Sequence, residues 1–315
     1  MIRSISKTIR SWKHLVRVCL NTTELDTAVY EHLMRLETLT HLTFEMTFVN
    51  DLPPHLSQAV LPRNPFPKLK DLTLDAYHPP LIVEWLNYFH FECLSSLSCT
   101  FGSIPPLLAS QIADLINAIT TQPCHKSLEK VDIMLNHDIM NVEIGLIRPL
   151  FSFTHLRYVD IFRICVLALS DDDLYDLAAS WPLLENLSLN VSNVADSLPT
   201  FKGFFHLLRR CPHLEQLYIN IDMRDTECVD VVRFYGEVRN HVMRRLSLGN
   251  SLINDAKHVA SILWVTLPSL KQVDLTVWHR DPIRGVPERD PLLDRWQKVN
   301  DYLGELRDRG VDVAR

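Results

Sequence analysis

Glycine is scarce in this 315-residue chain, and its eight glycines form neither a G-x-G nor a G-K-[ST] motif. Phosphate-binding loops need such glycines because the backbone must come close to the phosphate, so nucleotide binding by these routes is not expected. Histidine is plentiful, but no H-E-x-x-H zinc motif occurs. No spacing of side chains marks an activated nucleophile or a pair of carboxylates. We therefore expect no catalytic residue, no cofactor and no bound metal.

Paired cysteines, clustered cations and long apolar runs are lacking as well. The seven cysteines include no C-x-x-C pair, which favours small apolar packing residues in a reducing compartment over disulfides or a zinc site. The net charge is −6 and the cations are scattered, whereas nucleic-acid binding needs them clustered. No apolar run approaches the roughly 20 residues that span a bilayer, and residues 1–12 do not form a signal peptide. The expectation is a cytoplasmic or nuclear protein that binds neither nucleic acid nor membrane.

One short apolar phrase, L-x-x-L-x-L with other aliphatic residues allowed, recurs ten times along the chain. The copies start about 28 residues apart on average. Repetition at a period of this size is typical of stacked repeats, and this phrase is the strand signature of a leucine-rich repeat. The copies begin at Leu15, Leu39, Leu69, Leu94, Leu128, Leu156, Leu184, Leu214, Met243 and Leu270.

Residues 154–182 show how one repeat is encoded. Leu156, Val159 and Ile161 alternate with polar residues, as in a half-buried strand. Ser170 is suited to cap a helix whose first turn holds three aspartates, and Pro182 ends that helix. The other connections are predicted to be helical over 23–36, 79–90, 103–120, 141–151, 200–210, 225–241 and 254–266.

The pattern predicts an α/β leucine-rich-repeat solenoid, a horseshoe of about ten strand–helix repeats with a parallel sheet on its concave face. The alternative is a closed eight-stranded β/α barrel, which also alternates strands and helices. Ten units and polar residues at the third and fifth positions favour the open solenoid, because one side of its sheet meets solvent. The predicted division is 1–14 as an N-terminal extension or cap, 15–276 as the solenoid, 277–289 as a linker, and 290–315 as a capping helix and tail.

Several longer phrases carry a resemblance to a known family. They are S-D-D-D-L at 170–174, W-P-L-L-E-N-L-S-L at 181–189, L-R-R-C-P-H-L at 208–214, R-L-S-L-G-N-S at 245–251 and L-P-S-L at 267–270. Together they resemble the leucine-rich-repeat region of F-box-like proteins that basidiomycete fungi carry in large families. That family implies recruitment of substrates to a cullin–RING ubiquitin ligase, with an F-box docking the ligase adaptor. Only 14 residues precede the first repeat, so the F-box is expected to be absent and the adaptor to bind only if an F-box is supplied elsewhere.

The third, fifth and seventh positions of each phrase alternate with the core leucines and are expected to face the concave side. Asp132 and Asp160 stand at the same position of successive phrases, where like charges on adjacent strands repel. Aromatic and methionine side chains beside charge are typical binding anchors, although a neighbouring loop could equally cover them. The candidate partner-binding residues are Asp132, Met134, Tyr158, Asp160, Phe162 and Tyr218.

These observations favour a non-enzymatic protein–protein recognition module related to the substrate receptors of F-box-type ubiquitin ligases. Its partner is expected to be a protein, whose identity the sequence does not specify. One alternative is a repeat-only scaffold with no link to a ligase. The other is an enzyme with a site on the concave face, which three or more titratable groups converging in one pocket would favour.

Overall fold

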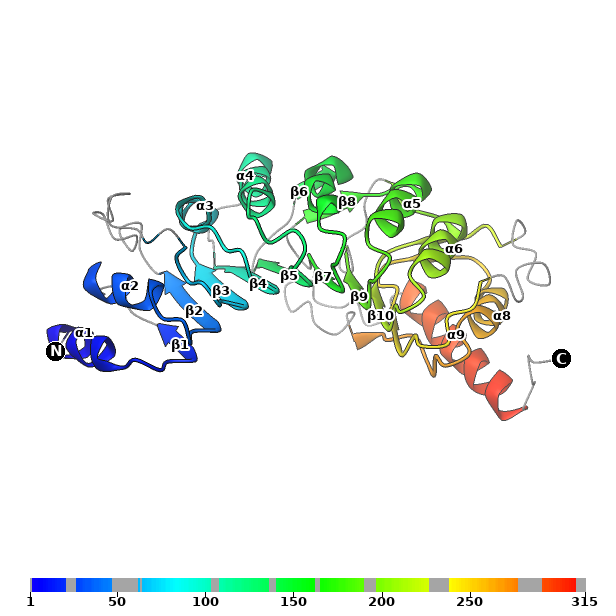
Figure 1. Ribbon diagram of the computed structural model, residues 1–315. Helices are drawn as coiled ribbons and strands as arrows, with labels where there is room; N and C mark the ends of the chain where they lie inside the picture. Colours follow the sequence, from blue (N-terminus) through cyan, green and yellow to red (C-terminus); the bar gives the residue numbers. More distant parts are fainter. Residues whose placement is uncertain are drawn as a thin grey trace. The chain divides into compact units, whose positions relative to one another are not determined.

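A computed structural model shows the chain as strands and helices in alternation (Figure 1). Its residues divide into two compact units: unit 1 is Met1–Met140 with Gly145–Leu156, and unit 2 is Asn141–Ile144 with Arg157–Arg315. The structure describes residues 2–20, 27–46, 62, 64–102, 108–135, 140–161, 165–189, 197–226, 238–276 and 291–309.

Unit 1 contributes five strands to the nine-stranded main sheet, and each pairs in parallel with the next. Burial alternates along them, because the core residues of each phrase are buried and the residues between them are half-exposed. Phe44 stacks on Trp85 of a helix, with ring centroids 6.0 Å apart, so the buried set faces the helices. The strands are β1 (Arg17–Leu20), β2 (His41–Met46), β3 (Asp71–Ala76), β4 (Ser96–Phe101) and β5 (Lys130–Leu135).

The helices that follow β1, β3 and β4 lie on one face of this sheet (Figure 1). Two prolines open the helix after β3, where their missing N–H groups would have no helical partner. The connection predicted to be helical over 141–151 instead forms a strand up to Glu143 and then two short 3₁₀ segments. The elements are α1 (Ile2–Ser11), α2 (Thr27–Met34), α3 (Pro79–Tyr88), α4 (Ala109–Thr120), η2 (Ile144–Leu146) and η3 (Arg148–Ser152).

Unit 2 contributes the other four strands of the main sheet, which also pair in parallel. The α/β class, with alternating strands and helices and a parallel sheet, is therefore as predicted. The last phrase differs, because among the described residues only a bridge between Val273 and Leu246 represents its strand. The four strands are β7 (Tyr158–Asp160), β9 (Asn186–Ser188), β10 (Gln216–Tyr218) and β12 (Arg245–Ser247). Two further sheets have two strands each. One pairs β6 (Met140–Glu143) with β8 (Cys165–Ala168), and the other pairs β11 (Asp222–Met223) with β13 (Leu252–Ile253).

Helix α5 (Asp171–Ser180) begins and ends where the sequence predicts. The Asp173 N–H donates to the Ser170 hydroxyl at 3.2 Å, and the Ser170 N–H donates to the Asp173 carboxylate at 3.0 Å. This reciprocal pair satisfies two N–H groups that have no partner within the helix. Trp181 follows the last helical residue, and Pro182 prevents the helix from continuing.

Asp171, the first residue of α5, also holds the start of the next helix. Its carboxylate accepts hydrogen bonds from the N–H of Thr200 at 2.7 Å, the N–H of Gly203 at 2.9 Å and the Thr200 hydroxyl at 2.8 Å. A negative charge at a helix N-terminus is favourable. The Asp171 side chain therefore stabilises the packing of α5 against the start of the helix that follows it. The remaining helices described in unit 2 are α6 (Phe201–Arg210), α8 (Ala256–Thr266) and α9 (Pro291–Asp308).

Helix α9 occupies the segment in which the sequence predicts an amphipathic helix. Its Trp296, Val299 and Leu303 are buried, and the Trp296 indole N–H donates to the carbonyl of Ser251 at 3.0 Å. The Asn300 amide binds both backbone groups of Val273, accepting from its N–H at 2.7 Å and donating to its carbonyl at 3.0 Å. The helix therefore completes the backbone hydrogen bonding of the last phrase.

Hydroxyl side chains link consecutive repeats. In three phrases, the residue just before the first leucine donates a hydrogen bond to a backbone carbonyl about one repeat earlier in the chain. These bonds satisfy carbonyl groups that lie outside the strand ladders. They run from Thr38 to Leu15 at 2.8 Å, from Ser127 to Leu94 at 2.8 Å, and from Ser269 to His241 at 2.6 Å.

Candidate partner-binding faces

The face of the unit 1 sheet that points away from the helices carries polar side chains in register. Because neighbouring strands pair residue for residue, the half-exposed positions form rows that cross the strands. We call them the polar rows of unit 1. The first is Arg17, His41, Asp71, Ser96 and Lys130; the second is Cys19, Thr43, Thr73, Ser98 and Asp132; the third is Glu45, Asp75, Thr100 and Met134.

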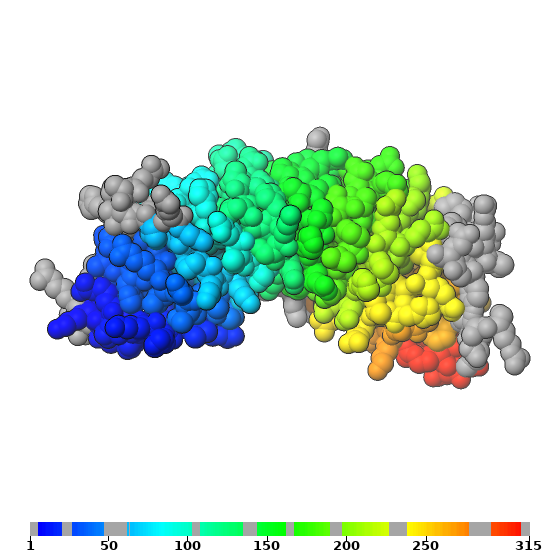
Figure 2. Space-filling model, viewed as in Figure 1, coloured from blue at the N-terminus to red at the C-terminus, as the bar shows by residue number. Residues whose placement is uncertain are grey.

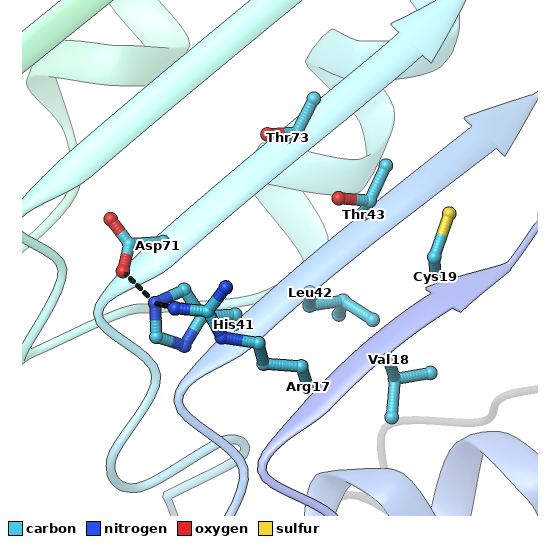
Figure 3. A pocket seen from close by; sticks show the side chains of 8 residues that line it. All are labelled: Arg17, Val18, Cys19, His41, Leu42, Thr43, Asp71 and Thr73. Carbon is cyan, nitrogen blue, oxygen red and sulfur yellow. Dashed lines mark hydrogen bonds and ion pairs between the residues drawn. The ribbon is translucent and has the colours of Figure 1, made fainter.

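A cavity of about 340 Å³ lies over β1, β2 and β3 at the start of these rows (Figure 3). At its rim, His41 Nε2 lies 2.8 Å from the Asp71 carboxylate and 3.3 Å from the Arg17 guanidinium. The other ring nitrogen, Nδ1, lies 2.8 Å from the Thr40 hydroxyl. The sequence places these residues at equivalent positions of successive phrases, but it does not indicate that they pair with one another. The cavity is lined by Arg17, Val18, Cys19, His41, Leu42, Thr43, Asp71 and Thr73.

Asp132 and Met134 lie on β5, on the same face. The Met134 side chain is 41% exposed, whereas the Asp132 side chain is mostly buried and lies 3.6 Å from Lys130. Burial raises the pKa of the Asp132 carboxyl, and the nearby Lys130 and Ser98 offset part of this increase. Its Oδ1 atom is buried and has no hydrogen-bond partner among the described residues.

Tyr158, Asp160 and Tyr218 lie in unit 2, on β7 and β10, and are half-buried. The Tyr158 hydroxyl donates to the Asp160 carboxylate at 3.3 Å, and Arg245 donates to the Tyr218 hydroxyl at 3.1 Å. Phe162 lies outside the described residues. The six candidate residues therefore fall into two groups in different units.

Some polar positions of unit 2 are buried, contrary to the expectation of a sheet face that meets solvent. Asn186 is 8% exposed, Ser188 3% and Ser247 0%, although all three occupy third or fifth positions of their phrases. In the registered strands, Asn186 lies between Tyr158 and Gln216, Ser188 lies between Asp160 and Tyr218, and Ser247 lies beside Tyr218. The solvent-exposed sheet face predicted from the phrase pattern is therefore present along unit 1 but not at these positions of unit 2.

The buried carboxyl of Asp132 predicts an unusual dependence of stability on pH. Because the folded protein raises its pKa above 3.8, its contribution to stability is largest below pH 3.8 and is lost as the pH rises through the folded-state pKa. Asp132→Asn should therefore stabilise the protein relative to wild type, and by more at about pH 7 than at about pH 3 in urea melts.

Asp222 supplies a control of opposite sign. Its carboxylate accepts two hydrogen bonds from the Arg224 guanidinium, at 2.6 and 2.9 Å, which lowers its pKa below 3.8. Its contribution to stability is present above pH 3.8 and is lost as the pH falls through the folded-state pKa. Asp222→Asn should therefore destabilise the protein at neutral pH and less in acid. The same pH trend in both variants would contradict the environments assigned to these two carboxyls.

Comparisons with known proteins add no relative. No family model matches the chain, and no curated protein matches its sequence. In the described part of the chain, no group of three or more His, Cys, Asp and Glu side chains is arranged to hold a metal ion. None of the helices between residues 2 and 309 that the structure describes has both the length and the apolar character needed to cross a membrane.

Proposed function

We propose that this protein is a non-enzymatic protein-recognition module, built as a leucine-rich-repeat solenoid with its parallel sheet on the concave face. In this proposal it is related to the repeat region of the basidiomycete F-box-like proteins, the substrate receptors of cullin–RING ubiquitin ligases, and works in the cytoplasm or nucleus. The proposal rests on the ten phrases and on the resemblance of the longer motifs.

The observation that carries the recognition role is the set of polar rows of unit 1. Five strands spaced about 4.8 Å apart present half-exposed side chains over a width of roughly 20 Å. Such a surface is broader than a small ligand needs and suits a segment of another protein. Met134 supplies an exposed apolar side chain two residues from the acidic Asp132 on the same face, a combination that favours a partner with a basic and an apolar group.

An enzyme is the second candidate, since Arg17, His41 and Asp71 converge at one cavity. The hydrogen bonds of His41 argue against this role. Nε2 contacts both Asp71 and Arg17, and Nδ1 contacts the Thr40 hydroxyl, so side chains of the protein itself occupy both ring nitrogens. We therefore favour recognition. A repeat-only scaffold with no ligase link is the other alternative.

Site-specific photo-crosslinking tests this function. A photoreactive amino acid in place of Met134, on the polar rows, should capture a partner from cells. The same residue in place of Asn87, exposed on the helical side of unit 1, should capture far less. Equal capture at both positions would contradict recognition by this face. A parallel pull-down with purified cullin adaptor tests the ligase link: we expect no binding by this chain alone.

A further inference from the structure

Strand β1 is the terminal strand of the unit 1 sheet, and no other described strand pairs with its outer edge. The N–H of His41 in β2 donates to the Val16 carbonyl at 3.1 Å. Backbone groups alternate sides along a parallel strand, so Val16, Val18 and Leu20 face β2, while the N–H and C=O of Arg17 and Cys19 point outward. Arg17 and Cys19 are both exposed. The edge therefore offers unpaired backbone groups to a further strand.

The segment that leads into this edge is strongly basic. The first 17 residues hold five of the 32 Lys and Arg residues and none of the 38 Asp and Glu residues, although the whole chain carries a net charge of −6. Lys7, Arg10 and Lys13 are exposed, and no ion pair joins them to an acidic side chain in the part of the chain that the structure describes. By contrast, Lys130 is paired with an aspartate. The segment just before β1 therefore carries cations that no acidic side chain of the described residues neutralises.

Two apolar side chains are exposed in the same segment. Trp12 is 49% exposed and Val16 is 52% exposed, and both lie between α1 and β1. His32 in α2 holds this stretch in place through a hydrogen bond of 2.8 Å from its Nε2 to the Trp12 carbonyl. Figure 2 shows the beginning of unit 1, in dark blue, at the surface. Tryptophan beside cations is common at the centres of protein interfaces.

These features select one occupant for the edge. A second copy of the chain would bring the same cations face to face across the two edges, and their repulsion opposes self-pairing. An acidic strand would meet Lys7, Arg10 and Lys13 with the opposite charge and would use the outward backbone groups of Arg17 and Cys19. We propose that an extended acidic segment of a partner protein binds by adding a strand to the free edge of β1. This site is separate from the polar rows of unit 1.

The test uses the full chain and a fluorescent peptide, Thr-Glu-Val-Glu-Val-Glu-Thr, with a Lys-for-Glu peptide as its control. Cys19→Pro removes the outward N–H but leaves the bonds between β1 and β2, because proline is tolerated on edge strands where its nitrogen faces solvent.

We expect Cys19→Pro to weaken binding of the acidic peptide at least about tenfold and Cys19→Ala to leave it unchanged. Arg10→Ala combined with Lys13→Ala should weaken it about three- to tenfold in low salt, and less at about 0.5 M salt.

Hydrogen exchange decides the result if Cys19→Pro fails to fold. In the wild-type chain, the acidic peptide should slow exchange of the Arg17 and Cys19 amides. Equal binding to the Pro and Ala variants, or no protection of these amides, would overturn the proposal. The proposal would also be overturned if the chain bound vesicles with about 30% phosphatidylserine, or single-stranded DNA, but did not bind the acidic peptide. Unchanged crosslinking at Met134 in Cys19→Pro would show that the polar rows act independently of this edge.

Discussion

Leu187→Ala should lower the free energy of unfolding by about 2–5 kcal/mol, the range for truncating a buried leucine. Leu187 is 0% exposed at the centre of β9, between Val159 of β7 and Leu217 of β10, which are themselves fully buried. The truncation leaves a cavity between strands that are held in register, so neighbouring side chains can fill only part of it. Urea unfolding at equilibrium measures the difference.

Asp172→Ala is the matched comparison, because it removes an exposed residue from α5, the helix that precedes β9 in the chain. Asp173 caps α5 and Asp171 binds the next helix, whereas Asp172 contributes only charge in the first turn. The expected cost is about 0.3–1 kcal/mol. If Asp172→Ala proved more damaging than Leu187→Ala, the assignment of Leu187 to the core and of Asp172 to the solvent-exposed surface would be wrong.

Gly203→Ala should also destabilise the protein, by about 1–3 kcal/mol, even though alanine is the better helix former. An added Cβ would lie 2.6 Å from Asp171 Oδ1, 3.1 Å from Asp171 Cα and 3.3 Å from Leu174 Cδ1. The Cα atom belongs to the backbone of α5 and cannot move alone. Helices α5 and α6 must therefore separate, and the Asp171 carboxylate would lose hydrogen bonds that hold α6.

Gly304→Ala provides the control within another helix. Nothing lies within 4 Å of a Cβ added at Gly304 in α9, so only the intrinsic helix preference changes. This variant should stabilise the protein by up to about 1 kcal/mol. Thermal unfolding of the two variants should thus shift in opposite directions. A shift of the same sign in both would indicate that close contact with Asp171 does not control the Gly203 position.

Local chemistry explains why much of the fold is predictable from the sequence. The alternation of Leu156, Val159 and Ile161 with polar residues needs no knowledge of neighbours to indicate a half-buried strand. Ser170 and Pro182 mark the ends of α5 in the same way, because a cap and a helix terminator act within one turn of their own positions. The parallel pairing follows from strands that are joined through helical connections.

Features that depend on packing between distant segments are not predictable in this way. Three successive aspartates indicate a charged first turn, but only the packing of α5 against α6 determines that Asp171 is the one that reaches Thr200 and Gly203. Similarly, the connection over 141–151 has apolar residues suited to a helix yet forms 3₁₀ turns, with Pro149 inside η3. Local preference is a weak guide where tertiary contacts dominate.

The candidate site shows the same limit. The phrase pattern places Asp132 and Met134 on the face opposite the helices, and both lie there. It does not reveal that Asp132 is largely buried, because that depends on the side chains of the strands around it. It also fails to indicate that Arg17, His41 and Asp71 pair, since their contact arises from the register of strands separated by 24 residues or more.

The hydrogen bonds that Thr38, Ser127 and Ser269 donate to earlier residues form in a fixed order during synthesis, because each carbonyl is made before its donor. Each supplies a donor to a carbonyl made about one repeat earlier. As the chain leaves the ribosome, the newest repeat has an unmatched carbonyl until the next repeat emerges. A fragment that ends within the repeats would leave such a carbonyl at its open end, where water would replace the missing hydroxyl group. A fragment that begins within them would expose the hydroxyl group instead, which water also satisfies at little cost.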